Sequence, residues 1–244
     1  MPNTDRPFDK LRPIKIKRNY TKTPAGSILI QSGKTTVLCT ASIDPKVPDW
    51  LAGSGKGWIT AEYNMLPGST SPRKRRDRNK VDGRTTEIQR LIGRSLRAVA
   101  NLNALGERLI TIDCDVLQAD GGTRTASITG GFIALVDAIA TIRKALPSPL
   151  VYPLRDSLAA ISVGLIQGKG YLDLDYELDS AADVDMNFVM TGSGRFIEIQ
   201  GTGEEATFTE RQFSSLMKLA KKGISELTAL QQQSLKGNWP FEKK

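Results

Sequence analysis

The sequence of 244 residues has 34 lysines and arginines against 26 aspartates and glutamates, a formal net charge of +8, and it contains no histidine. The lack of histidine excludes Ser-His-Asp and Cys-His catalysis and histidine-based metal sites, so any catalyst must use carboxylates, basic residues, hydroxyls, backbone amides or a bound cation. The positive charge favours a polyanionic partner, and composition alone does not choose among nucleic acid, an acidic membrane and nucleotides.

The first third of the chain has the pattern of strands and turns. Ile14 to Thr21 begins with alternating isoleucine and lysine, which predicts a strand with one apolar face. The apolar run Ile28–Ile30 lies between glycine-containing turns, and Thr35–Ala41 is β-branched and apolar, as in a buried strand. Residues 44–57 are rich in proline and glycine and predict a loop.

The middle of the chain changes to a helical period. A helix is predicted from Arg84 to Leu102, with an apolar stripe made of Ile88, Leu91, Ile92, Leu96, Val99 and Leu102. A strand at Leu109–Ile112 follows, and then a second helix from near Thr125 to Leu146, which ends before a proline.

The last third returns to strands before a final helix. The predicted strands are Ala160–Ile166, Tyr171–Tyr176, Asn187–Met190 and Phe196–Ile199. Thr209 and Gln212 match a capping box, so the last helix is predicted to begin at Thr209. Consecutive strands mixed with helices indicate an α+β fold with mixed sheets and flanking helices, and we expect a single domain over residues 1–244.

Two further properties bound the kind of protein. No apolar run reaches membrane-spanning length and the N-terminal segment lacks the apolar core of a secretion signal, so we expect no membrane partner and a cytoplasmic location. Cys39 and Cys114 lie in apolar stretches and are expected to be free and buried. No Cys-x-x-Cys is present to form a structural zinc site.

A basic segment, residues 73–80, holds six basic residues and one acid. It is either a solvated loop or a surface that contacts the phosphates of RNA, and the density of charge favours RNA contact. Few apolar residues are present to fold it alone, so we expect it to order on binding. An alternative RNA-binding surface is the trio of arginines on the predicted helix, Arg90, Arg94 and Arg97.

A second segment with chemical potential lies between a strand and a helix, at residues 118–127. Gly121 and Gly122 let the backbone approach a ligand, and the helix N-terminus offers free N–H groups. Thr123 adds a hydroxyl and Arg124 adds a bidentate donor suited to phosphate. The segment is either a binding site for a small anion or an ordinary capped loop.

The third segment gathers six acids, namely Asp173, Asp175, Glu177, Asp179, Asp183 and Asp185. The first three alternate with Leu172, Leu174 and Tyr176, as on the solvent face of a strand. Asp179 and Asp185 are symmetric about Ala182, and a turn there would bring their carboxylates face to face. Such a pair beside a polyanion is a candidate magnesium site.

Taken together, these segments resemble the ribonuclease PH family of phosphate-dependent 3′ exoribonucleases. The resemblance covers nearly the whole chain and is carried by Gly57–Tyr63, Gly83–Arg97, Ile112–Thr125, Leu172–Tyr176, Asp185–Asn187 and Met190–Arg195. Two departures are Gly68, where the family commonly has arginine, and Arg6–Lys10, which replaces the usual Arg-Pro-Asp-Gly-Arg opening.

The resemblance implies a role for each matching position. It implies phosphate binding by Arg84, Gly122, Thr123 and Arg124, catalysis and magnesium binding by Asp179 and Asp185, and contact with the tRNA acceptor stem by Arg73 and Arg76. Arg75 lies between these two in the basic segment and is also expected to contact RNA. It also implies a ribonuclease PH-like fold, a homo-hexamer built as a trimer of dimers, and trimming of tRNA precursors and other structured RNA, including ribosomal RNA. Inorganic phosphate would be the co-substrate, nucleoside 5′-diphosphates the products, and the reaction reversible.

Phosphorolysis suits a protein without histidine, because phosphate already carries nucleophilic oxygens at neutral pH and needs no strong base. Arginines and loop amides would hold the phosphate anion against the negatively charged phosphodiester of the RNA. Either magnesium or a protonated carboxyl would assist the leaving 3′ oxygen, and the sequence does not choose between them. A non-catalytic RNA-binding subunit and a hydrolytic 3′ exonuclease remain the rival interpretations.

Overall fold

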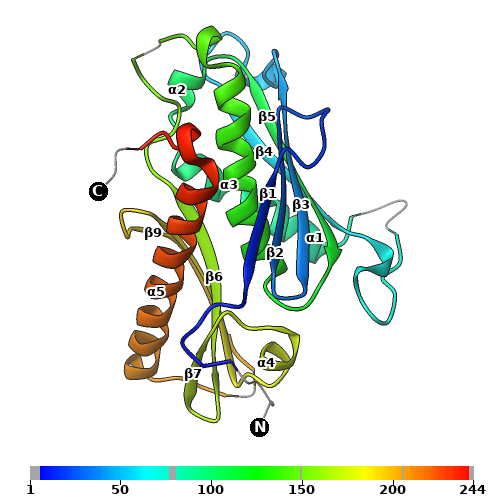
Figure 1. Ribbon diagram of the computed structural model, residues 1–244, viewed down its shortest axis with the longest axis vertical. Helices are drawn as coiled ribbons and strands as arrows, with labels where there is room; N and C mark the ends of the chain where they lie inside the picture. Colours follow the sequence, from blue (N-terminus) through cyan, green and yellow to red (C-terminus); the bar gives the residue numbers. More distant parts are fainter. Residues whose placement is uncertain (1–5, 77–80, 149, 205, 242–244) are drawn as a thin grey trace.

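The computed structural model describes residues 6–76, 81–148, 150–204 and 206–241. Two β-sheets lie on either side of a long helix, α3 (Thr123–Thr141), and a second long helix, α5 (Glu210–Leu235), covers the outside of one sheet (Figure 1). The layer order is therefore sheet, helix, sheet, helix, which confirms the α+β class expected from the sequence.

The first sheet has the order β1-β2-β3-β5-β4. Its strands are β1 (Ile14–Arg18), β2 (Gly26–Ser32), β3 (Thr35–Asp44), β4 (Trp58–Met65) and β5 (Leu109–Gln118). All neighbours are antiparallel except β4 and β5, which are parallel. Cys39 and Cys114 face each other across β3 and β5 and are free and buried, as expected. The sequence did not predict β4, and the loop before it contains a short 3-10 turn, η1 (Asp49–Leu51).

Two helices cover one face of this sheet. The buried side chains of α1 (Gly83–Ala98) and α3 join those of the strands in one core, and β2 touches α3 at Gly26, where a Cβ would lie 2.1 Å from a backbone oxygen of α3. The helix expected to continue to Leu102 ends at Ala98 instead. Asn101 begins a separate short helix, α2 (Leu102–Leu105), by accepting the backbone N–H of Ala104.

The second sheet has the order β7-β6-β8-β9 and is antiparallel throughout. Its strands are β6 (Leu158–Ile166), β7 (Lys169–Leu172), β8 (Val184–Thr191) and β9 (Phe196–Gly203). Every residue of β6 is buried because α3 packs on one face of the strand and α5 on the other. The capping box of Thr209 and Gln212 begins α5 as expected. The second helix ends at Thr141, before the expected Leu146, and a 3-10 turn, η3 (Arg143–Ala145), follows it.

The acids after β7 do not continue that strand. The strand ends at Leu172, Asp173 has a left-handed φ of 58°, and Asp175 accepts the N–H of Leu178 to begin the short helix α4 (Tyr176–Ser180). Asp173 is buried, at 2 % exposure, so the interpretation of these acids as the solvent face of a strand is wrong.

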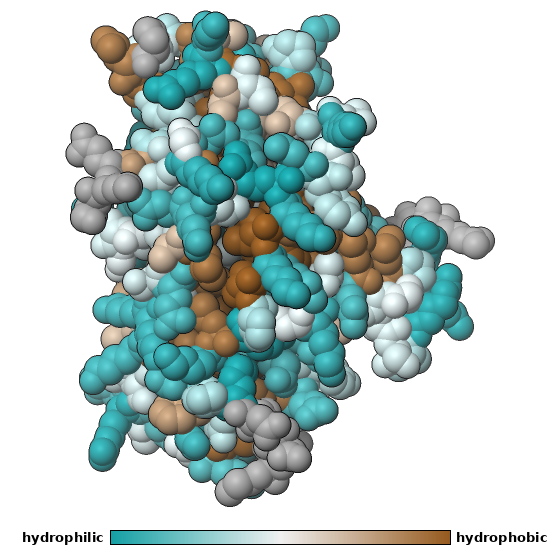
Figure 2. Space-filling model, viewed as in Figure 1, coloured by the Kyte–Doolittle hydropathy of each residue, from teal (hydrophilic) through white to brown (hydrophobic). Residues whose placement is uncertain are grey.

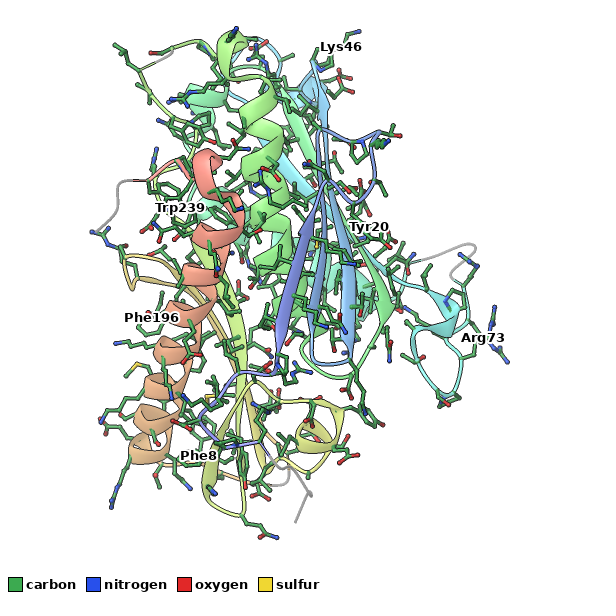
Figure 3. All side chains as sticks on the ribbon, in the orientation of Figure 1. Phe8, Tyr20, Lys46, Arg73, Phe196 and Trp239 are labelled. Atoms are coloured by element: carbon green, nitrogen blue, oxygen red, sulfur yellow. The ribbon has the colours of Figure 1, made fainter. Side chains whose placement is uncertain are left out.

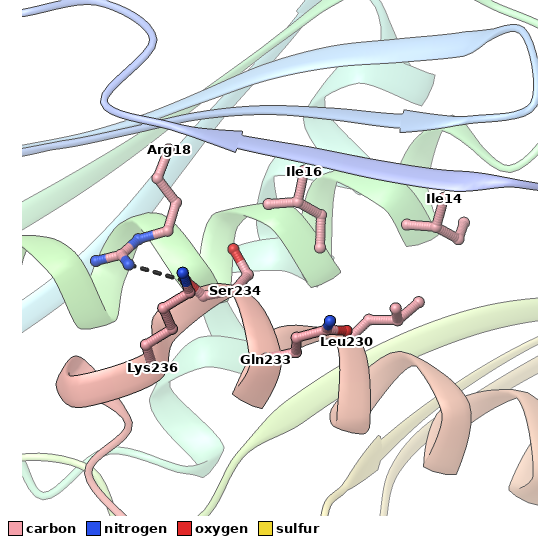
Figure 4. A pocket seen from close by; sticks show the side chains of 7 residues that line it. All are labelled: Ile14, Ile16, Arg18, Leu230, Gln233, Ser234 and Lys236. Atoms are coloured by element: carbon pink, nitrogen blue, oxygen red, sulfur yellow. Dashed lines mark hydrogen bonds between the residues drawn. The ribbon is translucent and has the colours of Figure 1, made fainter.

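A groove of about 440 Å³ lies between β1 and the C-terminal half of α5. Ile14, Ile16 and Leu230 line it (Figure 4), and Figure 2 shows a hydrophobic patch in the middle of this face of the molecule. None of the residues that line this groove is a predicted site residue. Within the described ranges, no helix has the length and hydrophobicity needed to cross a membrane.

Candidate active site

The N-terminus of α3 has the properties of an anion-binding site. Gly122 is the N-cap residue, with a φ of 67°, and no side chain among the described residues caps this end of the helix. The N–H groups of the first turn have no acceptor inside the helix and are available to an anion. Thr123 and Arg124 are the first two residues of the helix. The expected glycine loop is therefore present before a helix, which begins at Thr123, two residues before the expected start near Thr125.

The glycine loop, residues 119–122, packs against the segment that precedes α4. Gly121 has a φ of 71°, and a Cβ there would lie 2.6 Å from the carbonyl oxygen of Leu174 and 2.6 Å from the backbone carbon of Asp175. Glycine is required for both reasons, the left-handed backbone and the close approach. This contact joins the first sheet's loop to the segment that carries Asp179.

Tyr63 of β4 lies directly behind the glycine loop. Its hydroxyl donates to Thr123 Oγ1 over 2.9 Å, and the ring is 2 % exposed. Burial raises the pKa of Tyr63, while the charges of Arg84 and Arg124 act in the opposite direction. Both arginines therefore lie within electrostatic range of this hydroxyl. No local pattern pointed to Tyr63, although it lies in the block Gly57–Tyr63 that carries the family resemblance.

Arg124 is held by two side chains that sequence reasoning also missed. One of its guanidinium nitrogens lies 2.8 Å from Gln200 Oε1 and 3.3 Å from a carboxylate oxygen of Glu87. The Gln200 amide in turn donates to Glu87 over 2.8 Å. Glu87 lies one turn after Arg84 on α1, and Gln200 comes from β9 of the second sheet. These contacts fix the direction of the guanidinium before any ligand arrives.

Arg84 follows the N-cap of α1. Asp82 is that cap and accepts the backbone N–H of Thr85 over 2.6 Å. The hydrogen bonds from Thr85 and then from Lys74 lower the pKa of Asp82 to about 2. The Arg84 side chain is exposed and free to meet a ligand at the surface.

The two predicted carboxylates come from neighbouring elements. Asp179 lies in α4 and Asp185 near the start of β8, with a turn between them. Burial and the charge of Asp185 raise the pKa of Asp179, and Arg84 and Arg124 oppose that rise. The structure thus places Arg84, Arg124 and Asp185 within electrostatic range of the Asp179 carboxylate.

The donor set in this place suits magnesium. Within the described ranges, no cluster of three or more histidine, cysteine or acidic residues could hold a metal by itself. Magnesium usually takes one or two protein carboxylates and completes its shell with water and substrate phosphates. Two neighbouring carboxylates, Asp179 and Asp185, fit that pattern.

Arg73, Arg75 and Arg76 are exposed, on the segment between η2 (Pro67–Ser69) and α1. Figure 3 shows Arg73 at the edge of the molecule, pointing into solvent. Lys74 holds the segment in place, since its backbone N–H donates to the Pro67 carbonyl over 3.0 Å and its ammonium lies 3.1 Å from Asp82. Residues 77–80 of the basic segment lie outside the described residues.

The alternative trio on α1 is largely engaged inside the chain. Arg94 makes two hydrogen bonds to Glu198, of 2.5 and 2.6 Å. Arg97 lies over the ring of Trp58, 4.4 Å from its centre, and donates to the Ile59 carbonyl. Two of the three arginines are therefore committed to protein contacts, which favours the basic segment as the RNA-binding surface.

The sequence matches one family along most of its length. Residues 10–140 match the 3′ exoribonuclease family, domain 1, and residues 156–223 match the 3′ exoribonuclease family, domain 2. Ribonuclease PH of Rhodopirellula baltica is 66 % identical over 236 residues, covering 94 % of this chain and 96 % of the relative. Ribonuclease PH of Listeria monocytogenes is 57 % identical over 233 residues and covers 94 % of each chain.

Solved structures show the same fold at low identity. The crystal structure of rice (Oryza sativa) Rrp46 has a TM-score of 0.77 at 18 % identity and covers 95 % of this chain and 99 % of its own. The Archaeoglobus fulgidus exosome with RNA bound to the active site has a TM-score of 0.76 at 19 % identity and covers 92 % of this chain and 90 % of the matched chain. The family matches divide the chain in two, while the core around α3 includes residues of both sheets, so the single domain stays a prediction.

Proposed function

This chain belongs to the 3′ exoribonuclease family, and on that premise we propose that it removes nucleotides from RNA 3′ ends with inorganic phosphate as the nucleophile and nucleoside 5′-diphosphates as the products. The observation that carries the proposal is that the glycine loop at the start of α3 packs against the segment that leads to Asp179, with Arg84, Arg124 and Asp185 within electrostatic range of that carboxylate. A non-catalytic RNA-binding subunit has no need of this arrangement.

In the proposed reaction, an oxygen of inorganic phosphate attacks the phosphorus of the last phosphodiester. The bond from that phosphorus to the 3′ oxygen of the preceding nucleotide breaks, and that oxygen takes a proton. The shortened RNA keeps a 3′ hydroxyl, and the released nucleotide carries the former inorganic phosphate as its β-phosphate. Reversal of the same steps extends RNA from nucleoside diphosphates.

The main obstacle is to hold one anion against another. Arg84, Arg124 and the N–H groups at the start of α3 would bind the inorganic phosphate and reduce its charge. Thr123 is suited to orient it, because its oxygen already accepts from Tyr63 and its own proton is left to donate to phosphate. Arg124 is pre-positioned by Gln200 and Glu87, so little side-chain freedom is lost on binding.

Asp179 and Asp185 are the residues that would hold magnesium. When bound, magnesium would stabilise charge on the scissile phosphate and on the leaving oxygen. The carboxylates themselves repel phosphate groups. The positive charges of Arg84 and Arg124 are therefore needed to hold the inorganic phosphate and the RNA phosphate beside Asp179 and Asp185.

The substrate and the assembly are part of the proposal. We propose that the RNA is a tRNA precursor or another structured RNA, whose body contacts the exposed basic segment through Arg73, Arg75 and Arg76. The enzyme would work in the cytoplasm as a homo-hexamer, a trimer of dimers. In support of assembly, the face of the first sheet opposite α1 and α3 leaves Leu29, Leu38 and Leu117 only half-buried.

The experiment is a product assay on a 3′-extended tRNA precursor with and without inorganic phosphate. The proposal expects nucleoside diphosphates with phosphate and almost no release without it. A hydrolytic exonuclease would release monophosphates in both conditions. RNA binding with no nucleotide release would identify a non-catalytic subunit.

A further inference from the structure

A buried ion pair, Arg12 with Asp173, lies beneath the glycine loop and takes no direct part in the proposed chemistry. The two side chains are 5 % and 3 % exposed. Arg12 donates to Asp173 three times, from its backbone nitrogen over 2.8 Å, from Nε over 3.1 Å and from a terminal nitrogen over 2.7 Å. Arg12 precedes β1 of the first sheet, and Asp173 follows β7 of the second.

The pair also holds the glycine loop. The other terminal nitrogen of Arg12 donates to the Asp120 carbonyl over 2.6 Å. A Cβ on Gly122 would lie 2.9 Å from the guanidinium, so the guanidinium fills the space directly under the N-cap of α3. Thr35 independently joins the loop to the first sheet, with its hydroxyl 2.6 Å from the Gly121 carbonyl and 2.9 Å from the Asp120 nitrogen.

On its other side, the pair holds the segment that leads to Asp179. The Asp173 backbone N–H donates to the Ser162 carbonyl over 2.8 Å, and the Leu174 N–H donates to the Ser162 hydroxyl over 3.0 Å. Asp175 then begins α4, in which Asp179 lies. Arg12 and Asp173 therefore connect the two halves of the site, one contributed by each sheet.

A gain in stability is a weak explanation for a buried ion pair at this position. The cost of taking two charges out of water often equals or exceeds their attraction, and apolar replacements of similar volume are often neutral for stability. Catalysis gives a stronger reason, because misplacing a reacting group by about 1 Å can lower a rate about 100-fold.

We propose that Arg12 and Asp173 are positioning residues that set the separation between the phosphate-binding start of α3 and the carboxylate of Asp179. The inference rests on the proposed phosphorolytic function. It predicts that loss of the pair alters the binding of phosphate and the rate of nucleotide release more than it alters the fold or the binding of RNA.

The chain offers a matched control in a second Arg–Asp pair. Arg18, at the end of β1, contacts Asp137 over 2.8 and 2.5 Å, and the side chains are 22 % and 5 % exposed. Asp137 lies in the C-terminal half of α3, and Arg18 borders the groove beside α5 (Figure 4). This pair has similar geometry and no contact with the glycine loop or with α4.

The test replaces each pair by the same uncharged residues, as Arg12→Met with Asp173→Asn and as Arg18→Met with Asp137→Asn, because asparagine tolerates the left-handed backbone of Asp173. The readouts are the melting temperature, the affinity for inorganic phosphate measured by calorimetry without RNA or metal, RNA affinity, and kcat and KM for phosphate. In the Arg12 and Asp173 variant we expect kcat to fall by about tenfold or more and phosphate binding to weaken, with RNA affinity retained. The control variant should keep wild-type kcat and phosphate affinity.

A folded Arg12 and Asp173 variant with wild-type kcat and phosphate affinity would overturn the inference, and so would an equal loss in the control. If the double variant does not fold, Arg12→Lys decides, because lysine keeps the charge beside Asp173 but lacks the planar fork with which arginine also donates to the Asp120 carbonyl. That variant should then show the lower kcat, and wild-type kinetics would overturn the inference. If the wild-type protein shows no phosphorolysis, the proposed function is contradicted instead. The affinities of the wild-type protein and the variants for inorganic phosphate would still test the positioning role of Arg12 and Asp173.

Discussion

Removal of the Tyr63 hydroxyl tests how the phosphate site is organised. Tyr63→Phe deletes the 2.9 Å hydrogen bond to Thr123 Oγ1 and leaves the buried ring in place. A neutral hydrogen bond of this kind contributes about 1 kcal/mol. If that free energy orients the Thr123 hydroxyl for phosphate, its loss should raise the KM for phosphate by up to about fivefold. Burial raises the pKa of Tyr63, so the hydroxyl stays protonated near neutral pH and the effect should not depend on pH there.

A double-mutant cycle with Thr123→Val supplies the decisive comparison. Without the Thr123 hydroxyl, Tyr63→Phe has nothing left to orient and should cause no further rise in the KM for phosphate. Tyr152→Phe is the control, since this partly buried tyrosine lies near Asp137 at the other end of α3. The same rise in KM in both backgrounds, or no rise in the wild-type background, would refute the orienting role of Tyr63.

Other predictions concern the charges around the site. Arg124→Ala should raise the KM for phosphate and lower turnover while leaving tRNA affinity intact, and a loss of tRNA binding at unchanged phosphate dependence would show that its role is misassigned. Asp185→Asn should nearly abolish turnover, spare RNA binding and, in metal-free protein, bring the pKa of Asp179 closer to its ordinary value of 3.8 in a carbon-13 NMR titration, because a neighbouring like charge is removed. Asp82→Ala should lower the free energy of unfolding by about 1 kcal/mol at neutral pH. The pKa of Asp82 in the folded protein is about 2, below the ordinary 3.8, so ionised Asp82 stabilises the fold above pH 3.8. In urea unfolding, the difference in free energy of unfolding between Asp82→Ala and wild type should therefore shrink as the pH falls towards 2. Replacing the exposed Arg73, Arg75 and Arg76 by alanine should weaken binding of structured tRNA precursors more than it slows nucleotide release from a short oligonucleotide. It should also reduce the log–log slope of tRNA affinity against salt concentration by roughly 2 to 3 units. An unchanged slope would place the RNA contact elsewhere.

Local patterns predicted much of the fold because they report which side of an element is buried. The apolar runs of β3 and β6 and the capping box of α5 carried clear signals. The β4 strand was missed because its inward residues include the small Ala61 and its outward residues resemble a polar loop. The strand predicted over Tyr171–Tyr176 was wrong beyond Leu172 for a related reason. Alternation of acidic and apolar residues over a few positions does not distinguish a strand from a turn that buries Asp173.

The grouping of the candidate residues was predictable where they lie close together in the sequence. The glycines and the helix start at Thr123 and Arg124 are adjacent, and Asp179 and Asp185 are joined by one turn. Gln200 was not predictable because its contact with Arg124 depends on how the second sheet packs against α1 and α3. Contacts between side chains far apart in the sequence follow from the tertiary fold and leave no local pattern.

The most direct test of the account follows labelled phosphate into the product. The enzyme is incubated with a 3′-extended tRNA precursor and oxygen-18-labelled inorganic phosphate, and the released nucleotides are analysed by mass spectrometry. Attack by phosphate held at Arg84 and Arg124 predicts nucleoside diphosphates that carry the label in the β-phosphate. Unlabelled nucleoside monophosphates, released at the same rate without phosphate, would contradict the phosphorolytic mechanism.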